Sequence, residues 1–226
     1  MVEIRDAATL IVLRDRTSNP RVLMGPRGAA AAFMPNKFVF PGGAVDAADQ
    51  GLPLADALPL PCALRLGEAS SADPGALMAA AIRELWEETG QILGRPGHWS
   101  DPPRGWRGFA ASGHLPHVAA LQFVFRAVTP IGNPRRFDAR FFLADAANLA
   151  TDPDDFSGAE DELACLQWIA LEDARQFDLP FITQVVLAEL AARINDASPP
   201  AVVPFFRNDD EAHLVERLGG VSPLVV

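Results

Sequence analysis

Three glutamates crowd one short segment of the chain, Arg83-Glu84-Leu85-Trp86-Glu87-Glu88-Thr89-Gly90. On a helix, Glu87 and Glu88 follow Glu84 by three and four residues, so the three carboxylates project from one side. Like charges at these spacings each cost about 0.2–0.5 kcal/mol in an isolated helix. A hard divalent cation such as Mg²⁺ or Mn²⁺ binds carboxylate oxygens and would offset this repulsion. Spacing alone also allows a solvated acidic helix face with Arg83–Glu87 as an ordinary ion pair.

This segment and the preceding Phe40-Pro41-Gly42-Gly43 together resemble the two ends of the Nudix box, a Gly followed by Glu and then by Arg-Glu-aliphatic-x-Glu-Glu-x-Gly. The resemblance implies an α/β fold, a Nudix-like α/β/α sandwich in which a mixed sheet is flanked by helices. It also implies a Nudix diphosphatase in which Glu84, Glu87 and Glu88 hold Mg²⁺ or Mn²⁺ and water attacks phosphorus. Glu87, Glu88 and Arg83 are then catalytic, with Arg83 orienting a carboxylate through a salt bridge.

The box is interrupted in this chain. Six residues after Gly43 the family has Glu, and this sequence has Asp49. Thirty-three residues then separate Asp49 from Arg83, far more than the family's box contains, so residues from about 50 to 73 form an insert. A longer loop costs only about 0.6 kcal/mol per doubling of its length, so an insert at a loop–helix junction is tolerable. Asp49 either reaches the site with its shorter side chain or lies away from it.

An interrupted box of this kind resembles the coenzyme A diphosphatase branch of the family. Arg27, Phe40 and Gly43 fit a second signature of that branch and are implied to bind substrate, whereas Ala32 and Asn36 depart from it. The predicted reaction is therefore metal-dependent hydrolysis of the diphosphate of coenzyme A or acyl-CoA. ADP-ribose, dinucleotides and nucleotide sugars are the alternative substrates. A non-catalytic nucleotide-binding module with the same fold is the alternative of another class, because the first half of the box is broken.

Three arginines, Arg135, Arg136 and Arg140, stand close together in this acidic chain. In a strand Arg136, Asp138 and Arg140 share one side. Arginine forks bind phosphate oxygens bidentately, so Arg136 and Arg140 are predicted to bind the substrate, in coenzyme A its 3′-phosphate. Solvated arginines on an exposed edge strand are the equal alternative.

The reaction also needs a general base. Glu162 precedes the apolar run 163–169, and its place resembles that of an acidic residue ahead of a late strand in many Nudix enzymes. Glu162 is therefore predicted to be catalytic, and a solvated acidic turn is the alternative. Trp99 and Trp106, in a loop rich in Gly, Pro and Arg, either stack on an adenine or hold the loop in place.

The composition excludes several classes of partner. The chain has 226 residues, of which 49% are hydrophobic and 21% charged, as in ordinary globular proteins. A net charge of −10 opposes binding to nucleic acid and to anionic membranes, so the predicted partner is a small-molecule diphosphate. A homodimer is left open. Two cysteines without a CxxC motif, and an apolar run over 7–13 too short to span a membrane, indicate a cytoplasmic protein.

The spacing of apolar residues predicts the strands and helices that carry these side chains. Short apolar runs near Pro, Gly or Asp predict strands over 8–15, 22–26, 37–40, 118–129, 136–143 and 163–169. Helices are predicted over 75–89 and 181–194, because Asp-Pro and Asp-Leu-Pro signals precede them. Interleaved strands and helices predict a sheet covered on both faces, in one Nudix-like domain over 1–226 with a C-terminal tail from about 197 to 226.

Overall fold

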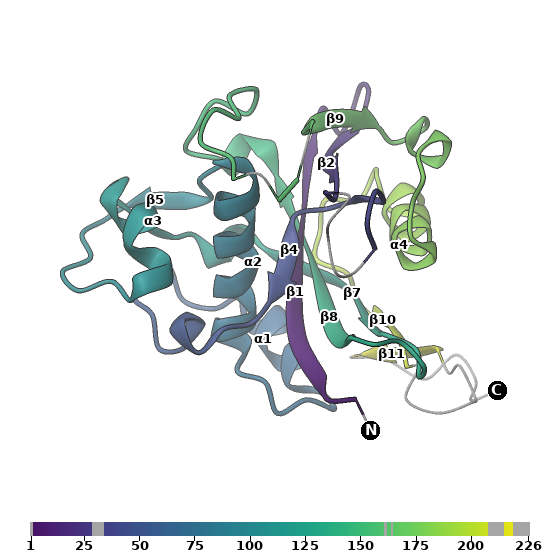
Figure 1. Ribbon diagram of the computed structural model, residues 1–226, viewed down its shortest axis with the longest axis horizontal. Coiled ribbons are helices and arrows are strands. Elements are labelled where there is room, and N and C mark those ends of the chain that lie inside the picture. Colours follow the sequence, from purple (N-terminus) through teal and green to yellow (C-terminus); the bar gives the residue numbers. More distant parts are fainter. Residues whose placement is uncertain (1, 29–33, 161, 164, 208–214, 219–226) are drawn as a thin grey trace.

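The computed structural model describes residues 2–28, 34–160, 162–163, 165–207 and 215–218 (Figure 1). Its strands are β1 (Ile4–Arg14), β2 (Arg21–Pro26), β3 (Phe38–Val39), β4 (Gly42–Ala44), β5 (Gly94–Pro96), β6 (His114–Pro116), β7 (Gln122–Val128), β8 (Arg136–Asp145), β9 (Gln167–Ala170), β10 (Val203–Phe206) and β11 (Val215–Leu218). Its α-helices are α1 (Leu60–Gly67), α2 (Pro74–Thr89), α3 (Arg107–Ala111) and α4 (Phe181–Ala192). Short 3₁₀ turns, among them Ala47–Asp49 before α1, connect several of these elements.

Nine of the strands within the described residues form one mixed sheet, in the order β11-β10-β7-β8-β1-β2-β3, with β4 also paired to β1 and β9 to β2. The central pair β1–β8 and the pair β7–β10 are parallel, and the other pairs are antiparallel. β5 and β6 form a separate two-stranded sheet. The mixed sheet between helices confirms the predicted α/β architecture.

Strand β1 supplies both faces of the sheet with core residues. Ala8, Leu10 and Val12 join the cluster that packs under α2, whereas Ile11 and Leu13 join the cluster that packs under α4. This alternation is what a strand buried on both faces requires. Figure 1 shows the result, with α1, α2 and α3 on one side of the sheet and α4 on the other.

Most of the predicted elements are present, with some changes of length. The predicted helices match α2 and α4, and the run 118–129 divides into a 3₁₀ turn over Val118–Ala120 and strand β7. The predicted strand over 163–169 is reduced to β9. Seven of the described helices and strands were missed: α1, inside the segment expected to be the insert, β10 and β11, inside the expected tail, and the short elements α3, β4, β5 and β6.

Some expectations fall wholly or partly outside the described residues. Ala32 is one of these, and so are 208–214 and 219–226 of the expected tail. The extent of a single domain over 1–226 stays a prediction. Among the described residues, no helix is both long enough and apolar enough to cross a bilayer.

Candidate active site

Helix α2 carries the acidic segment, and its two ends fix its position. Asp73 caps the first turn, where its Oδ1 accepts a hydrogen bond from the Ala76 amide at 2.7 Å. Gly90 ends the helix in the left-handed conformation, with φ of 74°. A side chain at Gly90 would also collide with Gly158, because a Cβ there would lie 2.9 Å from its backbone. A glycine is therefore required at this helix end.

Two of the three glutamates, Glu84 and Glu88, face the glycine strand β4. Gly42 donates its amide hydrogen to Glu88 Oε2 at 2.8 Å. A Cβ at Gly43 would lie 2.5 Å from the Glu84 carboxylate, so only glycine allows this close approach. Both side chains are buried, and Glu88 Oε1 has no partner among the described residues. The structure thus brings together the glycines and the carboxylates that the sequence pattern singles out.

This packing makes the site electrostatically strained. Burial raises the pKa of Glu84 to about 7, against the opposing pull of the Arg83 guanidinium. Burial, and then the nearby charge of Glu84, raise the pKa of Glu88 well above its usual range. The charge of Glu162 pushes both pKa values in the same direction, so Glu162 lies within electrostatic reach of the pair. Negative charge here is costly unless a cation joins it.

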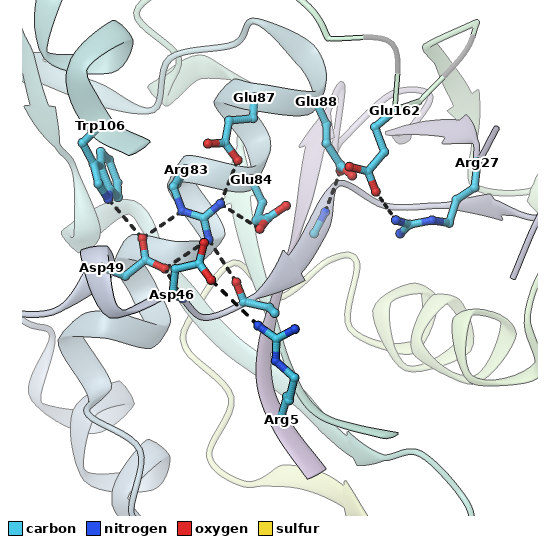
Figure 2. Close-up of polar contacts among 12 residues, drawn as sticks. Arg5, Arg27, Asp46, Asp49, Arg83, Glu84, Glu87, Glu88, Trp106 and Glu162 are labelled. Atoms are coloured by element: carbon cyan, nitrogen blue, oxygen red, sulfur yellow. Dashed lines mark hydrogen bonds and ion pairs between the residues drawn. The ribbon is translucent and has the colours of Figure 1, made fainter. Parts of the chain in front are cut away.

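Arg83 is the centre of a second, buried network (Figure 2). Its Nε donates to Asp49 Oδ1 at 2.9 Å and its Nη2 to Asp49 Oδ2 at 3.1 Å, a bidentate pair. Nη2 also donates to the Ala44 carbonyl at 3.0 Å. Nη1 donates to Glu84 Oε1 at 2.9 Å and to Glu87 Oε2 at 2.7 Å. The salt bridge expected of Arg83 is present. It holds the Glu87 carboxylate against the Arg83 guanidinium.

Asp49 lies beside the acidic segment, which is one of the two positions that the sequence left open for it. Its side chain is buried beside α2, although helix α1 and its connections separate Asp49 from Arg83 along the chain. Trp106 donates its indole hydrogen to Asp49 Oδ1 at 3.0 Å and is itself buried. Of the two roles predicted for Trp106, this contact agrees with the one in which the side chain holds its loop in place. The sequence offered no sign of this bond, because Trp106 and Asp49 are far apart along the chain.

Arg27 and Glu162 form an ion pair beside Glu88 (Figure 2). The pair stands at the edge of the sheet, where Arg27 bridges to Leu163 and the Gly28 amide donates to the Glu162 carbonyl at 3.3 Å. Arg27 Nε is buried without a partner among the described residues, and the Glu162 side chain is about half exposed. The structure thus places a predicted substrate ligand and the predicted base next to each other.

Three of the predicted substrate-binding residues lie elsewhere, which corrects those expectations. Phe40 is buried in the cluster under α4, so its ring contacts core residues. Arg140 is buried, where it pairs with Asp6 and Asp138. Arg136 donates its Nε to the Thr129 carbonyl at 3.0 Å. Carboxylates and carbonyls already engage these two arginines.

Arg140 and Arg126 instead fasten the insert to the sheet. Arg140 Nη2 donates to Ser70 Oγ at 2.7 Å, just before α2. Arg126 donates to the carbonyls of Glu68 and Ala69 at 2.9 and 3.0 Å, and its other hydrogens go to Asp138. Of the two arginines of the predicted phosphate clamp, Arg140 is therefore a buried anchor, with Arg126, for the connection between α1 and α2.

A divalent cation suits the residues that are present. Glu88 supplies a buried oxygen without a partner, and Glu84 supplies a second carboxylate whose charge burial disfavours. Across the described ranges, no three acidic, histidine or cysteine side chains already converge as a complete metal cage. Mg²⁺ often binds through one or two carboxylates, with water and substrate phosphate as its other ligands, so an incomplete cage is compatible with it.

Comparison with known proteins agrees with this geometry. No protein-family model matches the chain. A crystal structure of a NUDIX hydrolase from Alicyclobacillus acidocaldarius superposes with a TM-score of 0.60 at 26% identity, covering 88% of this chain and 99% of that one. A Caenorhabditis elegans protein named as nudix hydrolase 7 is 30% identical over 157 residues, 61% of this chain and 43% of its own length. In sequence and in fold, the chain is similar to Nudix hydrolases.

A second curated Nudix relative is the acyl-coenzyme A diphosphatase NUDT19 of Gallus gallus, 28% identical over 204 residues, 66% of this chain and 53% of the relative. The chain thus spans about half the length of the curated Nudix proteins it matches. In this chain, the two halves of the box-like pattern lie together in space although α1 separates them in sequence.

Proposed function

We propose that this chain is a metal-dependent diphosphatase that hydrolyses coenzyme A or acyl-CoA. The observation that carries the hydrolase proposal is the buried pair Glu84 and Glu88 beside Gly42 and Gly43, with Glu88 Oε1 bonded to none of the described residues. A stable fold gains nothing from an orphaned buried carboxylate oxygen, which costs about 1–3 kcal/mol. A cation-binding role explains why the chain keeps it.

Glu84 and Glu88 would hold Mg²⁺ or Mn²⁺. Glu87 was predicted as a third ligand, and its pairing with Arg83 makes it the outer member of the set. When bound, the ion would neutralise phosphate charge and lower the pKa of a bound water. Arg83 and Asp49 would keep the carboxylates in place by fixing the helix face against the 3₁₀ turn that contains Asp49.

Arg27 and Glu162 are the residues that would meet the substrate directly. Arg27 has a buried Nε–H that no described residue accepts, and this group can donate to a phosphate oxygen. Glu162 would accept a proton from the attacking water, and it lies within electrostatic reach of Glu84 and Glu88. Gly43, which was predicted to bind substrate, would instead let the Glu84 carboxylate lie close to the backbone, since it has no side chain.

The choice of coenzyme A or acyl-CoA rests on the interrupted box and on the relative that is named for acyl-CoA hydrolysis. ADP-ribose, dinucleotides and nucleotide sugars remain the competing substrates. A small-molecule diphosphate is the proposed partner in either case. Cytoplasmic location and a homodimer stay predictions.

A substrate panel tests the proposal. The purified chain is incubated with free coenzyme A, an acyl-CoA, ADP-ribose and a dinucleotide, each with MgCl₂, with MnCl₂ or with EDTA, and the products are separated by chromatography. We expect metal-dependent release of adenosine bisphosphate from coenzyme A, and EDTA abolishes it. Glu88→Gln should lower kcat by a factor of about 100 or more, because it removes charge where the ion would bind.

The exposed Glu172→Gln, on the α4 side, is the matched control and should keep full activity. Faster turnover of ADP-ribose would contradict the coenzyme A assignment but leave the hydrolase intact. If the wild-type chain hydrolyses no diphosphate with either ion, yet binds nucleotides, the non-catalytic module is the correct reading.

A further inference from the structure

The insert helix α1 forms one wall of a half-open cleft of about 380 Å³. Its lining includes Pro59, Pro61 and Cys62 from the insert and Leu121 and Gln122 from the start of β7. The volume is within the range of small-molecule sites, roughly 300–1,000 Å³. None of the residues that line the cleft belongs to α2 or β4, so it is separate from the carboxylate site.

Polar groups at the cleft include an oriented histidine. His117 lines the cleft, is buried, and has its Nδ1 2.5 Å from Asp56 Oδ2. The Arg95 Nε–H also donates to Nδ1, at 3.2 Å, so two groups hold this side of the ring and Nε2 is left for another partner. No contact of Nε2 occurs within the described part of the chain. Asp56 precedes helix α2 in the chain, inside the insert, and His117 follows α2. The contact between them therefore depends on the insert.

Arg95 adds a positive charge at the same place. Its side chain lines the cleft and is 58% exposed, and its Nε lies 3.5 Å from Asp56 Oδ1. Both Nη groups are without hydrogen bonds to the described residues, so they can donate to an anion. In a chain with a net charge of −10, such an available cation is a specific feature of this surface.

Gln122 contributes a buried acceptor. Its Nε2 donates to the Ala197 carbonyl at 2.9 Å, which fixes the orientation of the amide. Its Oε1 is buried and has no partner among the described residues. An unpaired buried acceptor is unfavourable, so an N–H or O–H group from a bound molecule would relieve it.

We propose that this cleft binds a small organic acid that carries an amide or hydroxyl donor. The acid group would meet the Arg95 Nη groups, the donor would meet Gln122 Oε1, and an apolar part would lie against Pro59 and Leu121. A carboxylate and a phosphate monoester share this chemistry. The site gives the insert a binding role that is independent of the proposed hydrolysis.

Calorimetry with matched probes tests the cleft. Pantothenate carries a carboxylate, hydroxyls and an amide, pantothenol replaces the carboxylate with a neutral alcohol, and 4′-phosphopantothenate adds a phosphate. We expect at least one of the two acids to bind saturably and to bind about tenfold or more tightly than pantothenol. A stronger response to 4′-phosphopantothenate than to pantothenate identifies the phosphate monoester as the preferred group.

Variants connect binding to the cleft. Arg95→Gln, at an exposed side chain, should remove the preference for the acids over pantothenol, and Gln122→Glu should weaken the acids by about tenfold through repulsion. Glu88→Gln should leave the binding unchanged, which separates this test from that of the proposed function. The imidazole resonances of His117, one of four histidines, should shift on titration. The proposal is overturned if neither acid binds at about 10 mM, or if Arg95→Gln leaves their binding unchanged.

Discussion

Arg83 has five N–H hydrogens, and its contacts account for all of them. They go to both oxygens of Asp49, to the Ala44 carbonyl, and to Glu84 and Glu87. Burial by itself would lower the pKa of the guanidinium, but the bond to Asp49 and the surrounding carboxylates raise it above its usual range. Arg83 therefore stays charged, and its function at the site is to hold carboxylates in position.

Replacing Asp49 by Asn should destabilise the protein by about 2–4 kcal/mol, because a buried charge loses its partner and an amide N–H would face the guanidinium. Urea denaturation measures the free energy of unfolding. Asp46→Asn is the matched control, since Asp46 meets Arg5 at 3.8 Å on the surface and should change stability by less than about 0.5 kcal/mol. Equal effects of the two variants would contradict the structural role of Asp49.

The raised pKa of Glu84 predicts a pH dependence of stability. A carboxyl whose pKa is about 7 when folded and 4.5 when unfolded binds its proton more tightly in the folded state. The contribution of Glu84 is therefore complete at a pH below about 4.5 and is lost as the pH rises through 7. Without metal, that loss should amount to about 1–3 kcal/mol.

Thermal and urea unfolding at several pH values in EDTA measure this loss. Glu84→Gln should remove it, so the difference between the wild type and this variant isolates the Glu84 contribution, while Glu172→Gln should keep the wild-type dependence. Added Mg²⁺ should restore stability most at the alkaline end. A wild-type curve parallel to that of Glu84→Gln would refute the assignment.

At the scale of elements, α2 is defined by its ends. Asp73 and Gly90 were readable in the sequence, because a side-chain cap and a left-handed glycine are local requirements. The close approach of Gly158 to Gly90 was not readable, since it depends on a loop far along the chain. The Glu160 amide donates to the Glu87 carbonyl at 2.9 Å in the same region, so the helix end also positions the segment that leads to Glu162.

Gly90→Ala tests this contact against Gly113→Ala. Both glycines have positive φ, 74° and 78°, so alanine costs about 1 kcal/mol at each through conformation. Only at Gly90 would the new Cβ meet another backbone, whereas at Gly113 no atom lies within 4 Å. Gly90→Ala should therefore be more destabilising by at least about 1 kcal/mol in urea denaturation. Equal losses would show that Gly158 moves aside at little cost.

There is a physical reason why helix α1 was not predicted from the sequence. It is short, it begins beside prolines, and it exposes Leu60 and Leu64 while burying Cys62 and Leu66. Apolar residues on both sides hide the periodicity that identifies a helix from sequence. The contacts of Cys62 with Leu121 and Phe123 show that tertiary packing supports this segment.

At the scale of the whole molecule, local signals predicted most elements and the paired glycine and glutamate motifs. They failed where a side chain meets a distant partner. The strand that contains Arg140 was predicted correctly. Its ion-pair partner Asp6 is more than 130 residues away in the sequence, so no local pattern indicated that Arg140 is buried. Asp49 was recognisable as a box position, and only the folded chain shows the Trp106 bond that holds it.

The parallel pairing of β1 with β8 has a consequence during synthesis. Ile4 pairs with Arg136 and Leu13 with Asp145, so β1 leaves the ribosome more than 120 residues before the strand that covers one of its edges. At about 5–20 residues per second, that delay lasts several seconds. A nascent chain that stalls before β8 would expose an unpaired, strongly apolar edge, which makes translation arrest in this interval an aggregation hazard that chaperones must manage.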